Sequence, residues 1–174
     1  MIAKRPLVLV GAMFCASLLP GSVAAQTEPL VTEYDDWVLN CQDVEGGLPC
    51  QIRHRVVDAN ANTQVLAFSI VFSEADDAHG MQLTLPLDFL LQPGVSIAID
   101  DYQVDGIEVS YCDINGCYVE ARLEQVAIDA FRTGHTGHIH MTARDGRRIG
   151  LPFSLAGFDA AEKKLRIETA SRTE

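Results

Sequence analysis

Short stretches in which apolar and polar residues alternate occur along most of the chain. Residues 51–58 and 81–87 alternate in this way, which is typical of strands with one buried face. Residues 64–72 form a dense run of β-branched and aromatic residues, which is typical of a strand buried on both faces. Further strands are predicted at residues 37–41, 95–99, 106–111, 119–123, 138–143 and 148–153. This succession of short strands predicts a mainly all-β fold, either a β-sandwich or a small barrel.

Two segments show helical patterns instead. In residues 123–132 the apolar side chains fall at helical spacing, which places them in one stripe that can lie on a sheet face. Gly134 suits the end of that helix. A second, short helix is predicted over residues 159–165, and a flexible polar tail over residues 168–174. Because strands and helices do not alternate along the chain, a parallel α/β sheet is not expected.

The N-terminus has the layout of a secretory signal peptide. Lys4 and Arg5 give it a positive start, residues 7–19 form a short apolar run, and small residues precede a cleavage site between Ala25 and Gln26. A buried N-terminal helix is the alternative, but it would give neither the basic start nor the small residues a role. We therefore expect export of the chain and removal of residues 1–25.

Cleavage would leave 149 of the 174 residues, enough for one domain with a sizeable core. We expect a lead-in over residues 26–36, a single domain over residues 37–167, and then the tail. Outside the signal peptide no segment approaches the roughly 20 apolar residues that a membrane helix needs. The mature chain is therefore expected to have no membrane span.

The mature chain is strongly acidic. Removal of residues 1–25 leaves 11 basic and 24 acidic residues, a net charge of −13 with histidine neutral. Such a charge repels nucleic acid and anionic lipid on average, although Arg144, Arg147 and Arg148 surround one turn and could form a local basic patch. Paired acidic residues occur at positions 35–36, 76–77 and 100–101. We expect them to be solvated surface residues, and the alternative is a calcium site.

Four cysteines remain after cleavage, Cys41, Cys50, Cys112 and Cys117. An even number in an exported chain predicts disulfides, and four cysteines allow three pairings. We favour Cys112–Cys117 because these residues flank an Asn-Gly turn between two alternating stretches, and Cys41–Cys50 across a similar Gly- and Pro-rich loop. A zinc site or a redox-active dithiol would normally use closer spacings than these.

The search for catalytic and ligand-binding motifs yields one candidate. No nucleophile elbow, zinc-protease motif, phosphate-binding loop or EF-hand pattern occurs in the sequence, so no catalytic or cofactor-binding residue is predicted. His138 and His140 would point to the same side of a strand, and His135 could approach from the preceding loop. Imidazoles so placed can bind zinc, copper or nickel, and the alternative is a polar strand face. His54, on the apolar face of its strand, is expected to be a core or edge residue.

Several motifs together resemble the invasion-associated locus B family of exported proteins of alphaproteobacteria. They span almost the whole mature chain in the family's order: Trp37-x3-Cys41 followed by Cys50, Leu85-Pro86-Leu87, Gln92-Pro93-Gly94-Val95, Cys112-x3-Gly116-Cys117, and Ser154-Leu155-x-Gly157-Phe158-x2-Ala161. Asp88 follows Leu87 where the family has glycine. The resemblance implies an immunoglobulin-like β-sandwich, a periplasmic or outer-membrane-associated location, and a part in host-cell invasion in pathogenic members. It implies no catalytic residues and no cofactor.

The sequence therefore predicts an exported, non-enzymatic protein of the periplasm or cell envelope, or one secreted from the cell. We expect it to bind an unidentified protein or envelope component through strand edges or loops, and not nucleic acid. The alternative is a periplasmic metal-binding protein that uses His135, His138 and His140.

Overall fold

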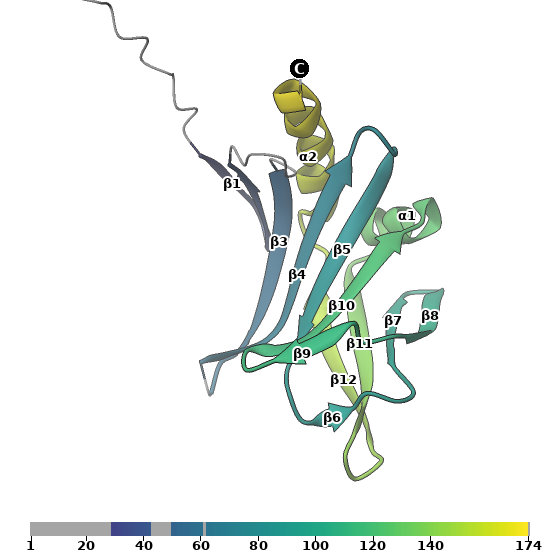
Figure 1. Ribbon diagram of the computed structural model, residues 1–174. Coiled ribbons are helices and arrows are strands. Elements are labelled where there is room, and N and C mark those ends of the chain that lie inside the picture. Colours follow the sequence, from purple (N-terminus) through teal and green to yellow (C-terminus); the bar gives the residue numbers. More distant parts are fainter. Residues whose placement is uncertain (1–28, 43–49, 61, 174) are drawn as a thin grey trace, which may run out of the picture.

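The computed structural model describes residues 29–42, 50–60 and 62–173. The predicted signal peptide and its cleavage site at Ala25 and Gln26 lie outside the described residues. Within them the chain forms two antiparallel sheets and two helices (Figure 1).

The larger sheet has seven strands, of which the first five follow one another in sequence order. From edge to edge they are β1 (Leu30–Tyr34), β2 (Trp37–Cys41), β3 (Cys50–Asp58), β4 (Thr63–Ser73), β5 (Ala78–Leu85), β10 (Gly116–Leu123) and β9 (Tyr111–Asp113). The smaller sheet contains β12 (Arg148–Ser154), β11 (Thr136–Ala143), β7 (Val95–Ile99) and β8 (Tyr102–Ile107), with β6 (Phe89–Leu90) paired to β11.

The core lies between the two sheets because alternate residues of each strand point inward. Trp37, Phe68 and Leu83 are fully buried on the inner face of the larger sheet, and Ile139 and Phe153 face them from the smaller one. Phe68 and Phe153 meet with their ring centroids 4.5 Å apart. The predicted fold class, a mainly β sandwich with one or two helices, is confirmed.

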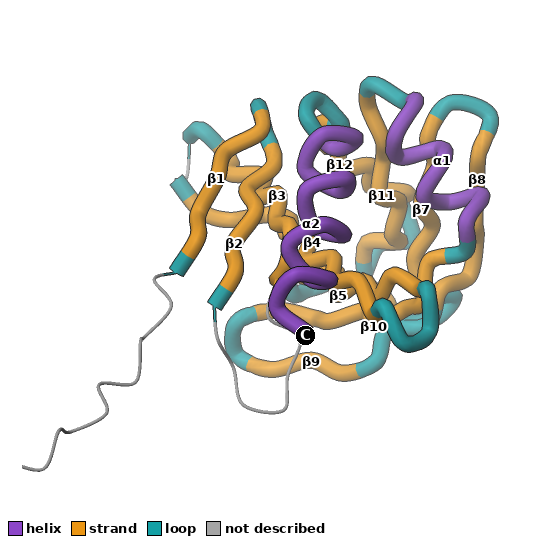
Figure 2. Tube along the Cα trace, turned by 90° about the horizontal axis from the view of Figure 1, so that it is seen from above, coloured by secondary structure: helices purple, strands orange, loops and turns teal. Residues whose placement is uncertain are grey.

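Both helices lie at the same end of the sandwich (Figures 1 and 2). Helix α1 (Gln125–Thr133) buries Ala127 and Phe131 of the predicted apolar stripe, and also Ile128, whereas Val126 of that stripe is exposed. Helix α2 (Phe158–Thr173) packs against β1, β2, β3, β4 and α1. Neither helix of the described part is long and apolar enough to cross a membrane.

Two predictions about the ends of the domain are wrong. The predicted tail over residues 168–174 is, as far as Thr173, the last part of α2, and Thr169 is fully buried. The tail was expected because the residues after Ile167 are mostly polar, but the polar Thr169 lies on the buried face of the helix. Residues 30–34, predicted as part of a lead-in, form β1, whose whole length pairs with β2.

The two disulfides are the pairings that the sequence favoured. Cys41–Cys50 joins β2 to β3 and Cys112–Cys117 joins β9 to β10, and in each case the bonded residues are direct partners across the ladder. Cys41 and Cys50 are buried in the core, whereas Cys112 is exposed at the edge of the larger sheet. The bridges therefore differ in their access to solvent.

We expect a mild reductant to open Cys112–Cys117 in the folded protein before it opens Cys41–Cys50, because an attacking thiolate must reach a sulfur atom. Alkylation of the freed thiols at successive times, followed by mass spectrometry of the peptides, measures the order. In urea both pairs should be labelled at similar rates. Equal rates in the folded protein, or earlier labelling of Cys41 and Cys50, would contradict the expectation.

Candidate functional site

An apolar cleft lies between the two sheets, next to β8 of the smaller sheet and β10 of the larger one. Its volume is about 270 Å³. The lining is supplied mainly by inward-facing side chains of four strands, including Met81, Ile97, Tyr102, Val104, Ala121 and Leu123. Ala127 of α1 contributes to it as well. Ligand sites in proteins are commonly concave and mostly apolar in this way, so we take this β8–β10 cleft as the candidate site.

On one side of the cleft, β8 is the last strand of the smaller sheet (Figures 1 and 2). It pairs with β7 through Ile99↔Tyr102 at a two-residue turn, and no other described strand lies beside it. In an antiparallel hairpin closed this way, alternate residues direct their backbone groups to the neighbour. The backbone N–H and C=O groups of Gln103, in the regular part of the ladder, therefore point away from β7, toward solvent.

The larger sheet also ends at the cleft. Strand β10 pairs with β5 along Cys117–Leu123, but with β9 only along Gly116–Tyr118. Beyond Tyr118, the side chain of Ser110 accepts a hydrogen bond of 3.0 Å from the backbone N–H of Glu120, and no described strand continues along this edge. The cleft thus opens between two strand edges.

The sequence predicted this region incorrectly. Residues 106–111 were expected to form one strand, whereas β8 ends at Ile107 and β9 begins at Tyr111 in the other sheet. Gly106 adopts a φ of 70°, and the ladder with β7 is irregular at this point, so the chain turns from one sheet to the other. The alternation of Tyr102 and Val104 after the Asp100-Asp101 turn is the signal that could have identified β8.

Exposed acidic residues surround β8, whereas Arg122 lines the cleft itself and Asp105 lies at the outer face of the smaller sheet, beside Ser96 and Arg148. Asp100, Asp101, Asp105, Glu108 and Glu124, on β8, its flanking turns and the start of α1, are all exposed. Hydrogen bonds from Ser96 and Gln103 lower the pKa of Asp105, which is therefore ionised at neutral pH. Partial burial raises the pKa of Tyr102, and the charge of Glu124 adds to this effect.

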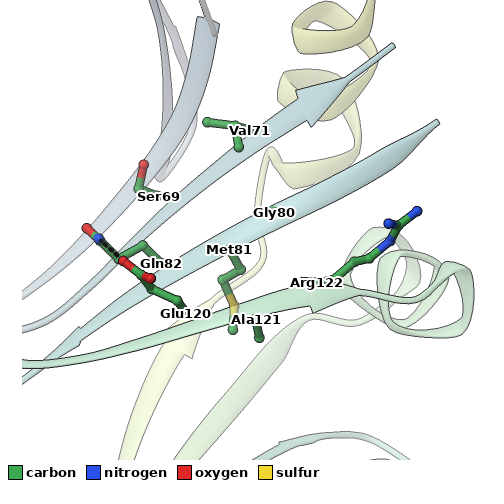
Figure 3. A pocket seen from close by; sticks show the side chains of 8 residues that line it. All are labelled: Ser69, Val71, Gly80, Met81, Gln82, Glu120, Ala121 and Arg122. Atoms are coloured by element: carbon green, nitrogen blue, oxygen red, sulfur yellow. Dashed lines mark hydrogen bonds between the residues drawn. The ribbon is translucent and has the colours of Figure 1, made fainter. Parts of the chain in front are cut away.

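A second concavity lies on the outer face of the larger sheet (Figure 3). This outer hollow measures about 560 Å³ and is lined by Ser69, Val71, Gly80, Gln82, Glu120 and Arg122, among others. Gln82 donates a hydrogen bond of 3.2 Å to Glu120 across the strands. Figure 3 shows Met81 and Ala121 pointing to the opposite side, where they line the β8–β10 cleft. The hollow is open, and its polar side chains share the lining with apolar surface such as that of Val71.

The candidate metal ligands are only partly brought together. His138 and His140 share the outer face of the smaller sheet, as predicted, with parallel rings whose centroids are 6.0 Å apart. Burial, together with the charges of Arg148 and His138, lowers the pKa of His140. Among the residues that the structure describes, His135 included, no group of three or more His, Cys, Asp or Glu side chains could hold a metal ion. The metal-binding alternative is therefore not supported.

The suggested basic patch is largely neutralised. Arg144 pairs with Asp88 at 2.9 Å and Arg147 with Asp145 at 2.7 Å. Arg148 lies near the histidine pair, beside a hollow of about 420 Å³.

The sequence did not reveal a buried charged cluster between α1, α2 and β5. Glu162 of α2 is fully buried and accepts hydrogen bonds from His79 at 2.9 Å and from Arg132 at 2.6 Å. This cluster ties both helices to the larger sheet. His54, in contrast, is a core residue as expected: it stacks on Trp37 and donates a hydrogen bond of 2.7 Å to the carbonyl of Asp36.

These features define a class: a β-sandwich with two disulfides between neighbouring strands and an open cleft between two sheet edges. The chain belongs to the invasion associated locus B (IalB) protein family, whose model matches residues 37–166. Its fold is similar to the crystal structure of invasion associated protein B from Bartonella henselae, with a TM-score of 0.75. That match has 25% sequence identity and covers 82% of this chain and 98% of the other. No curated protein matches the chain.

Proposed function

We propose that this chain is an exported, non-enzymatic binding protein that holds another macromolecule, a protein or an envelope component, at the cell envelope. The observation that carries the proposal is the β8–β10 cleft, an apolar concavity that opens between two strand edges. Exposed strand edges are ready templates for pairing with another chain. The cleft therefore offers a partner both apolar contacts and backbone hydrogen bonds.

Two further observations support the location. Disulfides form and persist in oxidising compartments such as the periplasm, and this chain has two of them. The sequence begins with the layout of a signal peptide, which would be cleaved between Ala25 and Gln26. We propose the periplasm or cell envelope as the site of action, with secretion from the cell as a further possibility. A contribution to host-cell invasion is the extension that the family description suggests for a pathogen.

Photo-crosslinking in living cells tests the binding role. A benzophenone amino acid would replace, in separate full-length proteins, Val104 at the cleft, Val71 at the outer hollow or Ile114 at the exposed tip of the β9–β10 hairpin. We expect irradiation to give a discrete product from at least one position, and mass spectrometry to find the same envelope component in repeated experiments. Ile167 on α2, 61% exposed, provides the matched control for random capture. No product above that control at any of the three positions would overturn the proposal.

A further inference from the structure

We propose that β8 accepts an extended segment of a partner protein as an additional strand of the smaller sheet. The apolar side chains of that segment would fill the β8–β10 cleft, and its alternate, basic side chains would face the exposed acidic residues that surround β8. This inference rests on the proposed binding function and names the chemistry of the partner at the same cleft.

The backbone of β8 is the first element of the argument. Residues 103–106 are exposed, and Gln103, which lies opposite Ala98 in the regular part of the ladder, directs its backbone groups away from β7. A strand placed at the normal spacing of about 4.8 Å could therefore hydrogen-bond to these groups without disturbing the existing ladder. The regular part of β8 available for this pairing is Tyr102–Val104, because the ladder with β7 becomes irregular between Val104 and Ile107.

The cleft supplies the second element. In strand addition, main-chain hydrogen bonds provide affinity and pockets for alternate side chains provide specificity. Tyr102 and Val104 of β8 face the cleft, and Val104 is 37% exposed although it is apolar. An added strand would direct every second side chain to this same side and cover these apolar surfaces. Valine, isoleucine or leucine at those positions would match the apolar lining.

Charge selects among extended segments. Five exposed acids surround β8, Asp100, Asp101, Asp105, Glu108 and Glu124, and they outnumber the two nearby basic residues, Arg122 in the cleft lining and Arg148 beside Asp105. The whole chain carries a net charge of −11. A segment whose outward side chains are lysine or arginine is attracted to this edge, and one with acidic side chains is repelled. The favoured occupant is thus an extended peptide in which apolar and basic residues alternate.

The other sheet edges are less suited to the same role. Strand β12 carries Pro152, which has no N–H to donate, and β9 has three residues and is bonded to its neighbour by a disulfide. The remaining edge is that of β1 in the larger sheet. The concavity at this end of the sheet is lined mainly by polar and charged residues, including Asp35, Asp36, Arg53 and Arg55. Two free edges border the apolar cleft in the described structure, but on β10 the N–H of Glu120 is already bonded to Ser110, which leaves β8 as the better acceptor of a strand.

Proline substitution separates this model from simple insertion of an apolar ligand. Gln103→Pro removes a backbone donor that points to solvent, a place where edge strands tolerate proline. Gln103→Ala is the matched control, because it removes the same side chain but keeps the N–H. The probe is a peptide of about eight residues in which lysine and valine alternate, a strand-like pattern. Binding to the purified full-length protein is measured by fluorescence anisotropy.

We expect Gln103→Pro to weaken binding of this peptide about tenfold, and Gln103→Ala by less than about threefold. Raising the salt from about 0.1 M to about 0.5 M should weaken binding, since the attraction is partly electrostatic. A peptide with glutamate in place of lysine should bind at least about tenfold more weakly. Equal binding by the two Gln103 variants, or by the two peptides, would overturn the proposal; the first result would indicate an apolar ligand that needs no backbone pairing.

A second pair of variants keeps the test decisive if Gln103→Pro perturbs folding. Val104→Lys places a charge in the cleft, whereas Val31→Lys changes an exposed valine on β1, the edge strand of the other sheet. Only Val104→Lys should weaken binding of the lysine–valine peptide. If neither peptide binds and cells yield a crosslinked partner only from Val71 or Ile114, strand addition is wrong while the binding function stands. If no position yields a partner, the binding function itself fails.

Discussion

Replacing Glu162 with alanine is expected to lower the free energy of unfolding by about 3–5 kcal/mol. The side chain is fully buried and joins Arg132 of α1 to His79 of β5, which is itself buried. Without the carboxylate, the buried imidazole of His79 loses its acceptor, and the partly exposed guanidinium of Arg132 keeps only the more distant Asp129, at 3.5 Å. Both helices would then lose their common attachment to the larger sheet. Urea unfolding followed by circular dichroism provides the measurement.

Asp159→Ala is the control on the same helix. Asp159 also forms an ion pair with a basic residue, Lys163, at 2.7 Å, but both side chains are largely exposed. Exposed pairs of this kind contribute about 0–1 kcal/mol, so the control should be close to the wild type. Similar losses for the two variants would show that burial of Glu162 does not determine its effect.

The pH dependence provides an independent check on the cluster. Burial alone would raise the pKa of Glu162, but hydrogen bonds from His79 and Arg132 and their charges lower it below its usual range. A carboxylate with a lowered pKa stabilises the fold above the pKa of the unfolded chain, about 4.3, and this stabilisation is lost as the pH falls through the lower folded-state value. The difference in stability between wild type and Glu162→Ala should therefore be largest near neutral pH and shrink in acid. A difference unchanged at about pH 3 would contradict the ionic role.

The strands were predictable where a short stretch of sequence alternates between apolar and more polar residues, because one face of such a strand is apolar. Trp37 and Leu39 in β2, and Met81, Leu83 and Leu85 in β5, alternate with more exposed residues, so the sequence itself shows which side is buried. The disulfide pairings were favoured for a related reason, since each joins neighbouring strands across a short loop. In such regions local pattern and tertiary environment agree.

The candidate site was not predictable by the same reasoning. The β8–β10 cleft exists because the chain leaves the smaller sheet after Ile107 and enters the larger one at Tyr111, which leaves an edge of each sheet open. No local pattern encodes that crossing. The buried cluster escaped for another reason: its members are 83 and 30 residues apart in sequence, and Glu162 counts as polar in any reading of helical periodicity.

Gly157→Ala is expected to be more damaging than its small size suggests. Gly157 has a φ of 86° immediately before α2, and a β-carbon added there would overlap the carbonyl oxygen of Tyr34. The backbone of β1 must therefore move away or the start of α2 must shift. Phe158 is the first residue of α2, and its ring packs edge-on against Trp37 with the ring centroids 4.9 Å apart. We expect a loss of about 3 kcal/mol or more from the combined backbone strain and repacking.

Gly146→Ala isolates the contribution of the close approach. Gly146 has nearly the same φ, 85°, but a β-carbon there would meet no atom within 4 Å. Its loss should be limited to the cost of a left-handed conformation, about 1–2 kcal/mol. Urea unfolding of both variants measures the two losses of stability. Because the two substitutions impose the same backbone penalty, the difference between the losses gives the contribution of the close approach, provided that the m-values are equal. An equal loss would mean that β1 yields to the new methyl group without cost, and that the contact between Tyr34 and Gly157 does not determine where α2 begins.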